Sequence, residues 1–320
     1  VPLATGGMGQ VWEAYDERLA GRRVVVKLML DGDSGTASLH SEDLATRRER
    51  FLREVRTTAT IEHPGVPAVF DAGIDRPTGR PFIALQLLRG REIQTLVDET
   101  EQDTEPVEVA RATAIGAQIA SVLDEVHRHD VVHRDIKPAN LMLTPGGIVK
   151  VLDFGVAALL GSGAHPRLTR IGTTVGTPAY MSPEQVLGNT VGPTSDVYAL
   201  ACVLYAVLTG RPPFRETAQR SYFWHHVHAE PQPIRDLRRP DVPVEIQSLL
   251  LAMLAKDAED RPDAADVYEC LLPFASEPGA IAPPAGPGFP ENIADLDPCL
   301  PFVRPMGASV RRRGTAMGTR

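Results

Sequence analysis

Residues 133–141, with the sequence HRDIKPANL, carry two positive charges, one carboxylate and one carboxamide, and the types and spacing of these four groups suit one kind of chemistry. Asp135 can accept a proton from a substrate hydroxyl, and Lys137 can neutralise charge on a phosphate in transfer. Asn140 can bind a divalent metal ion through its carbonyl oxygen. Apolar runs flank the stretch on both sides, as expected for a loop between buried strands. A loop that only connected two strands would not need this set, so the stretch indicates a catalytic centre.

The elements that must position this loop change in type along the chain. Residues 1–88 contain short alternating or β-branched runs typical of strands, with a single amphipathic helix predicted over 47–61. From about residue 104 the apolar spacing becomes helical, and residues 195–210 are apolar nearly all round, which predicts a helix buried on every side. Ser195 or Asp196 is expected to cap the start of that helix, and Gly210 its end. The turn residues 144–147 predict a hairpin just after the catalytic loop.

Composition sets the limits on other classes of protein. The net charge of -8 disfavours nucleic-acid binding. The sequence has no run of about 18 apolar residues, so no membrane span is expected. The three cysteines lie far apart without metal-ligand spacing, so neither a zinc site nor a disulfide framework is expected. Residues 274–320 are rich in Pro and Gly and include a basic RRRG cluster, which predicts a linker or a juxtamembrane tail.

Together with the DFG triplet at residues 153–155, the catalytic loop resembles that of protein kinases. Over residues 1–273 the chain resembles a bacterial serine/threonine protein kinase of the eukaryotic-like (Hanks) type, with a receptor-kinase-like catalytic domain. The resemblance implies an α+β, bilobal fold, with a β-rich small lobe at 1–88 and a helical large lobe at 89–273. It also implies ATP and Mg²⁺ (or Mn²⁺) as cofactors and proteins as substrates.

The resemblance assigns roles to individual residues. Asp135 would orient the substrate hydroxyl and accept its proton, while Lys137 would stabilise the transferring phosphoryl group. Asn140 and Asp153 would hold the metal ion. Lys27, in the strand sequence VVVK, would bind the α- and β-phosphates, with Glu54 as its ion-pair partner.

The nucleotide pocket is predicted from three further stretches. TGGMGQVW resembles the glycine-rich loop, although Ala4 replaces its first glycine, and IALQLL resembles the hinge, with Leu85 as gatekeeper. Main-chain groups of the hinge would bind adenine, and three apolar side chains would enclose its ring. The residues expected to contact nucleotide, besides Lys27 and Asp153, are Ala4, Gly6, Gly9, Val11, Val25, Gln86, Leu88 and Met142.

The segment after DFG is expected to regulate activity. Thr169, Thr173 and Thr174 are candidate autophosphorylation sites whose phosphate would pair with Arg134, and Thr177 is expected to contact substrate. Structural roles are implied for His133 under the catalytic loop, for Asp196 as a support of that loop, and for a buried pair between Glu184 and Arg261.

Several alternatives remain open. The chain could be a pseudokinase that acts as an ATP-binding scaffold, although Lys27, Glu54, Asp135, Asn140 and Asp153 are all present. A small-molecule phosphotransferase is disfavoured by the features associated with peptide docking. His225, His226 and His228 could in principle bind a metal ion, but large-lobe packing is the favoured interpretation. A homodimer through the small lobe is one option for assembly. The expected location is the cytoplasm, either as a free kinase or as the cytoplasmic part of a membrane-anchored receptor kinase.

Overall fold

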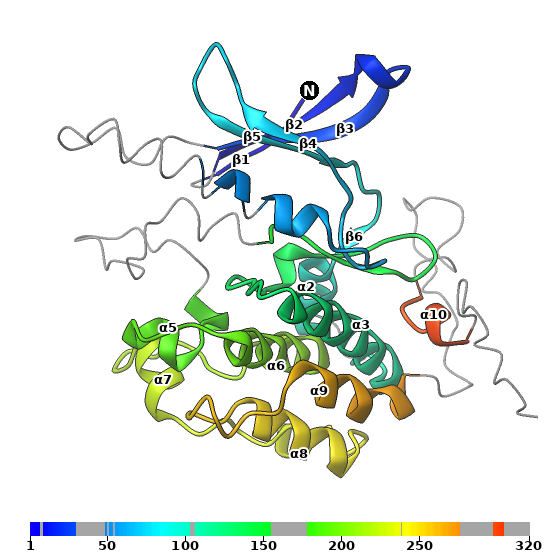
Figure 1. The fold of residues 1–320 in the computed structure, drawn as a ribbon. Helices are drawn as coiled ribbons and strands as arrows, with labels where there is room; N and C mark the ends of the chain where they lie inside the picture. Colours follow the sequence, from blue (N-terminus) through cyan, green and yellow to red (C-terminus); the bar gives the residue numbers. More distant parts are fainter. Residues whose placement is uncertain are drawn as a thin grey trace, which may run out of the picture.

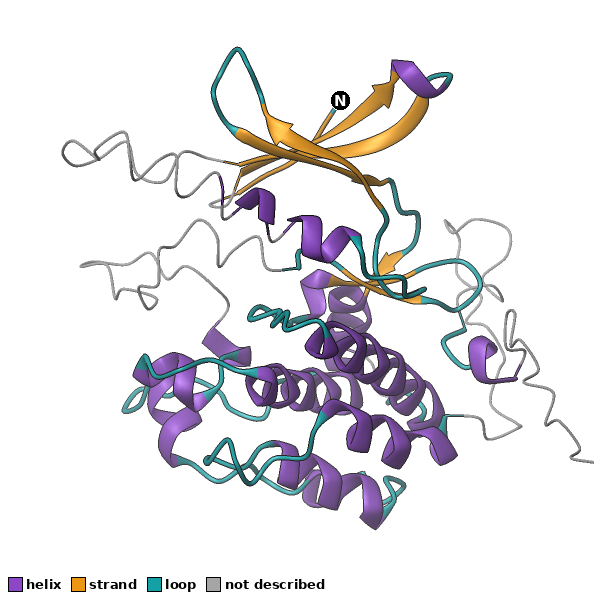
Figure 2. Cartoon of the chain, viewed as in Figure 1, coloured by secondary structure: helices purple, strands orange, loops and turns teal. Residues whose placement is uncertain are grey.

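The chain forms a small β-rich lobe above a larger helical lobe, as Figures 1 and 2 show. This description rests on a computed structural model that describes residues 1–6, 9–29, 49, 51–53, 55–102, 106–154, 178–237, 239–275 and 297–303. Both the α+β class and the bilobal arrangement expected from the sequence are confirmed. Among these residues, no helix combines the length and the apolar character needed to cross a membrane.

The small lobe is built on a five-stranded antiparallel sheet with the order β1-β2-β3-β5-β4. Its register sets Lys27 opposite both Val11 and Ile83, and Val25 opposite Leu85. These side chains therefore share one face of the sheet, because directly opposed residues point the same way. The strands are β1 (Pro2–Gly6), β2 (Gly9–Asp16), β3 (Arg22–Met29), β4 (Val69–Ile74) and β5 (Pro81–Gln86).

A helix packs against that face of the sheet. Residues 51–53 and 55–59 are helical, within the range predicted from the sequence. Phe51 and Val55 from this helix form a buried cluster with Met29 and Ile83 from the sheet. The cluster fixes the helix beside the strand that carries Lys27.

The catalytic loop ends in a second, small sheet, made of β6 (Arg91–Glu92), β7 (Leu141–Leu143) and β8 (Val149–Val151). Strands β7 and β8 form the hairpin expected around residues 144–147. Leu141 and Leu143 are buried in the large-lobe core, whereas Met142 is half-buried. Since side chains alternate along a strand, Met142 faces away from that core.

The large lobe packs around α6, which is buried from Ser195 to Leu208. Helix α3 crosses it so closely that a Cβ at Gly116 would lie 2.6 Å from a Leu204 methyl carbon. The α-helices are α2 (Ile93–Gln102), α3 (Val109–Arg128), α5 (Pro183–Leu187), α6 (Pro193–Thr209), α7 (Tyr222–His228), α8 (Val244–Met253), α9 (Ala264–Leu271) and α10 (Leu300–Val303). The 3₁₀ turns are η1 (Glu17–Leu19), η2 (Pro138–Asn140), η3 (Pro178–Tyr180), η4 (Ile234–Leu237) and η5 (Leu272–Phe274).

The start of α6 differs from the prediction. The helix begins at Pro193 with Gly192 as its N-cap, so neither Ser195 nor Asp196 caps it. Instead the Ser195 hydroxyl lies in the first turn and accepts a hydrogen bond from the main-chain N–H of Gly192. Proline is favoured at the first helical position, where its missing N–H costs nothing. The C-terminal prediction is confirmed, because Gly210 ends the helix at φ 75°.

The two lobes are joined beside the small sheet. In the segment after the small-lobe helix, His63 Nε2 lies 3.1 Å from the Ser121 hydroxyl of α3. The main-chain N–H of Val151 donates to Gly65 O at 2.9 Å, and the Lys150 ammonium donates to Val66 O at 3.1 Å. These bonds hold β8, which leads directly to Asp153, against the base of the small lobe.

Candidate active site

The polar side chains of the catalytic loop converge on the carboxylate of Asp135. The Lys137 ammonium lies 2.7 Å from its Oδ2, and the Asn140 side-chain nitrogen donates to the same oxygen at 2.9 Å. Asn140 also donates to the main-chain oxygen of Asp135 at 2.8 Å. Because the amide nitrogen of Asn140 is engaged twice in this way, its Oδ1 is the atom suited to binding a metal ion.

Asp196, at the start of α6, supports this loop from inside the large lobe. Its buried carboxylate accepts hydrogen bonds from the main-chain N–H groups of His133 and Arg134, each at 2.8 Å, and lies 2.9 Å from His127 Nε2. Arg134 adopts φ 67°, a left-handed conformation that costs free energy in a non-glycine residue. Charge-assisted hydrogen bonds to Asp196 offset that cost.

His133 lies beneath the loop, as the sequence predicted. It is 1% exposed, and its Nε2 lies 2.7 Å from the main-chain oxygen of Leu152. Its Nδ1 accepts a hydrogen bond from the N–H of Asp135 at 3.3 Å. These partners assign the proton of a neutral imidazole to Nε2. His133 thus connects the catalytic loop to the residue that precedes Asp153.

Asp153 connects the two lobes. Its carboxylate is 2.9 Å from the Lys27 ammonium, and Lys27 is almost completely buried. The residue before it, Leu152, donates a main-chain hydrogen bond to Asn140 O at 2.8 Å. Asp153 itself has φ 63°, again left-handed. Glu54, the predicted partner of Lys27, lies outside the described residues.

The residues expected around the nucleotide line both sides of this centre. Val11, Val25 and Lys27 share the inner face of the five-stranded sheet, where Ala4 and Gly6 of β1 pair with Val11 and Gly9. Met142 belongs to the small sheet of the large lobe.

Gln86 ends β5, and its N–H donates to Ala68 O. Leu88 follows on the connection to the large lobe.

Gly9 occupies a position that excludes a side chain. Its φ is 152°, and a Cβ there would lie 2.4 Å from Leu28 O on the neighbouring strand. This close approach of β2 and β3 explains why the glycine-rich stretch needs glycine at this position.

The oxygen atoms at the centre fit a hard divalent cation. Asn140 offers an amide oxygen and Asp153 a carboxylate, the ligand types that Mg²⁺ prefers. In the part of the chain that is described, no group of three or more His, Cys, Asp or Glu side chains forms a metal cage. Two oxygen donors are the number that Mg²⁺ commonly takes from a protein, with its remaining ligands supplied by water and phosphate.

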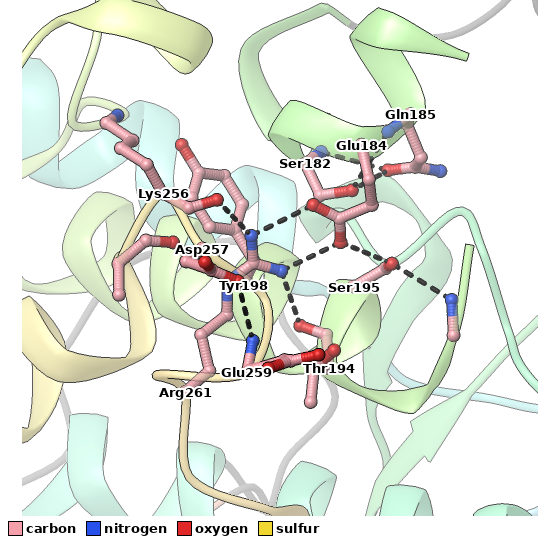
Figure 3. Close-up of polar contacts among 12 residues, drawn as sticks. Ser182, Glu184, Gln185, Thr194, Ser195, Tyr198, Lys256, Asp257, Glu259 and Arg261 are labelled. Atoms are coloured by element: carbon pink, nitrogen blue, oxygen red, sulfur yellow. Dashed lines mark hydrogen bonds and ion pairs between the residues drawn. The ribbon is translucent and has the colours of Figure 1, made fainter. Parts of the chain in front are cut away.

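Glu184 and Arg261 form the buried pair expected from the sequence, shown in Figure 3. Two guanidinium nitrogens of Arg261 bind the two carboxylate oxygens of Glu184 at 2.7 and 2.9 Å. Arg261 also donates to the main-chain oxygens of Thr194, Ala255 and Lys256.

Burial alone would raise the pKa of Glu184. Hydrogen bonds from Arg261 and Ser195 outweigh burial, so the pKa lies below its ordinary value.

The segment that carries Glu184 is also tied to the catalytic loop. Ser182 caps α5 and forms a capping box with Gln185. The Gln185 side-chain nitrogen then donates to the main-chain oxygen of Arg134 at 2.8 Å. The sequence did not predict this contact or the one between His127 and Asp196, because Gln185 and His127 carry no motif signal of their own. Thr169, Thr173, Thr174 and Thr177 lie outside the described residues.

The three histidines of α7 lie in different surroundings. His226 is fully buried, and its Nδ1 lies 2.9 Å from the Tyr198 hydroxyl. His225 stacks on the Phe214 ring, and His228 is exposed. The favoured interpretation, packing within the large lobe, fits this arrangement.

Comparison with known proteins agrees with this geometry. A protein kinase domain profile matches residues 2–271. The chain is 42% identical over 262 residues to the DNA damage-responsive serine/threonine-protein kinase RqkA of Deinococcus radiodurans, covering 82% of this chain and 37% of RqkA. It is 33% identical over 319 residues to the serine/threonine-protein kinase PknA of Mycobacterium tuberculosis, covering 99% of this chain and 68% of PknA. The chain therefore belongs to the protein kinase family, and its relatives are bacterial serine/threonine-protein kinases.

Two further comparisons extend this result. Serine/threonine-protein kinase PknB of Mycolicibacterium smegmatis is 35% identical, with 97% of this chain and 49% of PknB covered. The crystal structure of the Mycobacterium tuberculosis PknI kinase domain shares the fold, with a TM-score of 0.61 at 22% identity, covering 86% of this chain and 93% of that one. The chain spans about a third to two thirds of the length of these three curated relatives.

Proposed function

We propose that this chain is an active protein kinase that transfers the γ-phosphoryl group of ATP to serine and threonine hydroxyls of proteins. The observation that carries the proposal is one continuous path of short polar contacts. It runs from Lys27 to Asp153 at 2.9 Å, from Leu152 to Asn140 at 2.8 Å, and from Asn140 to Asp135 at 2.9 Å. Residues more than a hundred positions apart thus meet in one centre made of the types that phosphoryl transfer needs.

In this proposal Asp135 binds the substrate hydroxyl and accepts its proton. Lys137, which pairs with Asp135 at 2.7 Å, would stabilise negative charge on the phosphoryl group in transfer. Both groups are held before substrate arrives, so the protein contributes mainly orientation and charge stabilisation.

Asn140 and Asp153 would hold Mg²⁺, or Mn²⁺ in its place, through Oδ1 and the carboxylate. The ion, when bound, neutralises charge on the phosphate oxygens. Lys27 would bind the α- and β-phosphates while staying close to Asp153, and its ion pair with Glu54 remains a prediction. The adenine would lie between Val11 and Val25 above and Met142 below, with main-chain groups of Gln86 and Leu88 as its polar partners.

We infer that phosphorylation of Thr169, Thr173 or Thr174 raises activity, with Thr177 contacting substrate. The exposed Arg134 guanidinium, next to the catalytic Asp135, is available to pair with such a phosphate. Mass spectrometry after incubation with ATP and Mg²⁺ tests this, and finding no phosphate over residues 160–178 would contradict it.

We also propose that two copies pair through the small lobe. Among the described residues, large apolar side chains exposed on this lobe include Leu3, Trp12, Tyr15 and Leu19. Sedimentation of the unaltered chain and of Trp12→Arg tests the proposal, since the substitution is expected to yield monomers. We also propose that the reaction takes place in the cytoplasm, where ATP is supplied.

Incubation with ATP, Mg²⁺ and a generic basic protein tests the main proposal, with the products identified by mass spectrometry. We expect phosphoserine and phosphothreonine on the protein substrate. ATP binding without any protein phosphate would instead favour an ATP-binding scaffold. Phosphate on a small metabolite alone would favour a small-molecule phosphotransferase.

A further inference from the structure

A short segment beyond the kinase match lies against the large lobe. The matched region ends at residue 271, yet residues 297–303 are described beside α3, where Figure 1 shows α10. Pro298 and Cys299 are buried, and so is Asp297, a charged residue. A predicted linker or tail would not be expected to bury such residues.

The segment packs on an apolar patch of α3. Cys299 forms a buried cluster with Ala110 and Ala114 of α3 and with Ala275, which follows η5. Phe302 packs against this cluster and also against the main core. Ala110 and Ala114 are one helical turn apart, and their small side chains leave room for the thiol and the ring to approach the helix.

Gln118, one further turn along the same face of α3, adds polar contacts. Its side-chain nitrogen donates to Pro298 O and to Gly147 O, each at 2.9 Å. Its Oε1 accepts a hydrogen bond from the N–H of Val149 at 2.8 Å. One side chain therefore binds both the segment and the β7–β8 hairpin.

The segment is also ordered by its own contacts. Asp297 Oδ1 accepts a hydrogen bond from Cys299 N at 3.0 Å, and Phe302 N donates to Cys299 O at 3.0 Å. Besides burial, the Asp297 carboxylate raises the pKa of the Cys299 thiol, whereas the Arg111 guanidinium of α3 lowers it. Asp297 is thus held through its Oδ1, while its Oδ2 is buried without a hydrogen-bond partner among the described residues.

We propose that residues 297–303 form a C-terminal clip, which docks on this apolar patch of α3 and belongs to the folded kinase unit. In this arrangement the folded unit includes residues 297–303 as well as the region matched to the kinase domain. Removing the clip would expose Ala110 and Ala114 to solvent and leave one acceptor fewer for Gln118. The proposal does not depend on phosphoryl transfer.

The cysteines provide a direct test, because the three sit in different environments. Cys270 is exposed on α9, Cys202 is fully buried in α6, and Cys299 is buried only through docking of the clip. Burial raises the pKa of Cys299 to about 12, and the thiolate is the reactive form. Undocking would therefore increase both the access to this thiol and its ionisation.

The experiment is timed labelling of the full chain with N-ethylmaleimide, read for each cysteine by mass spectrometry. We expect Cys299 to react at least about tenfold more slowly than Cys270, in keeping with burial and a raised pKa. Equal rates at Cys270 and Cys299 in the unaltered chain would overturn the proposal.

A pair of variants then tests the interface itself. Phe302→Ser is expected to bring the rate at Cys299 close to that at Cys270, while Cys202 stays unreactive as an internal report that the core is folded. Val244→Ser, at an exposed apolar position on α8, is the matched control and should leave Cys299 protected. Unchanged protection of Cys299 in Phe302→Ser would contradict the docking described here.

Discussion

At the scale of single residues, the site depends on two strained positions and the groups that hold them. Arg134 and Asp153 have φ values of 67° and 63°. Arg134 directly precedes Asp135, the proposed catalytic base, and Asp153 is itself a proposed metal ligand. Asp196 fixes the first through main-chain hydrogen bonds, while Lys27 pairs with the second. Strain of about 1–3 kcal/mol per residue is maintained by such surroundings.

Asp196→Asn tests the support of the catalytic loop. The amide keeps one acceptor oxygen but has no charge, so one of the two main-chain N–H groups loses its partner and Arg134 is less well held. We expect kcat to fall by about 10²-fold with little change in the KM for ATP, because orientation and not nucleotide binding is affected. Asp124→Asn, at a surface ion pair on α3, is the control, and an equal loss in both variants would contradict this role.

His226 should make stability depend on pH. Burial lowers its pKa to about 3, and the Lys256 ammonium contributes in the same direction. The Tyr198 hydroxyl, the Phe214 ring and His225 also surround or adjoin it. As the pH falls below the ordinary histidine pKa of about 6.5, the His226 imidazole becomes protonated in the unfolded chain but stays neutral in the folded chain. The free energy of unfolding therefore decreases by up to about 1.4 kcal/mol per pH unit.

His226→Gln should remove this part of the pH dependence, measured as the free energy of unfolding between pH 7 and pH 5. His228→Gln, at the exposed histidine of the same helix, should leave the unaltered profile in place. Identical profiles for His226→Gln and the unaltered chain would show that the buried imidazole does not titrate in this way.

Single residues were the part of the site most open to prediction from sequence. Asp135, Asn140 and Asp153 belong to short motifs whose spacing is local, so their identity could be read directly. The contact between Lys27 and Asp153 could not, because it depends on how the two lobes meet. The partners of Asp196 could not be predicted in full either, since His127 carries no motif signal.

At the scale of elements, the approach of β2 to β3 decides what the glycine-rich stretch can tolerate. Gly9→Ala would force a Cβ against Leu28 O and displace one strand. We expect the affinity for a non-hydrolysable ATP analogue to fall by about tenfold or more, equivalent to about 1.4 kcal/mol. Gly21→Ala is the matched control, since Gly21 also has positive φ but has open space around it.

Comparing Gly9→Ala with Gly21→Ala separates the effect of the Cβ contact with Leu28 from the effect of positive φ in a non-glycine residue. A titration in which Gly21→Ala weakens nucleotide binding as much as Gly9→Ala would attribute the loss to the small lobe as a whole. A loss confined to Gly9→Ala is the result that close strand packing requires.

The Glu184–Arg261 pair joins α5 to the loop before α9. Arg261→Gln leaves Glu184 buried without its charge partner, and removing one member of a buried pair costs about 3–5 kcal/mol. Urea unfolding should show a loss of that size. Arg128→Gln, at a mostly exposed arginine on α3, should cost less than about 1 kcal/mol, and a similar loss in both variants would contradict a structural role for the buried pair.

Elements were predicted well where one periodicity dominates and less well at their ends. The buried helix α6 and the β7–β8 hairpin were evident from apolar patterning. The start of α6 was misplaced because two polar residues suggested a cap, whereas Pro193 begins the helix and Ser195 bonds back to Gly192. Capping geometry depends on main-chain conformation, which residue types alone do not reveal.

At the scale of the whole molecule, the two lobes meet through a few bonds, with the catalytic centre between them. The bilobal fold was implied by the resemblance to protein kinases that the motifs carry. The clip on α3 was not predicted, because its Pro- and Gly-rich surroundings are typical of a linker. Its partner Gln118 also lies 180 residues away from Pro298 in the sequence. Docking of this kind depends on a packed surface that exists only once the large lobe has folded.

The central claim is that Asp135 lies at the centre of a working phosphotransfer site. The most direct test is the initial rate of γ-phosphoryl transfer from ATP to a generic basic protein, with Asp135→Asn compared against Asp130→Asn. Asp130 is an exposed turn residue nearby, outside the proposed site. We predict a loss of at least about 10³-fold in Asp135→Asn and a rate within about twofold of the unaltered chain in Asp130→Asn. Equal rates in the two variants, at any level, would contradict the account.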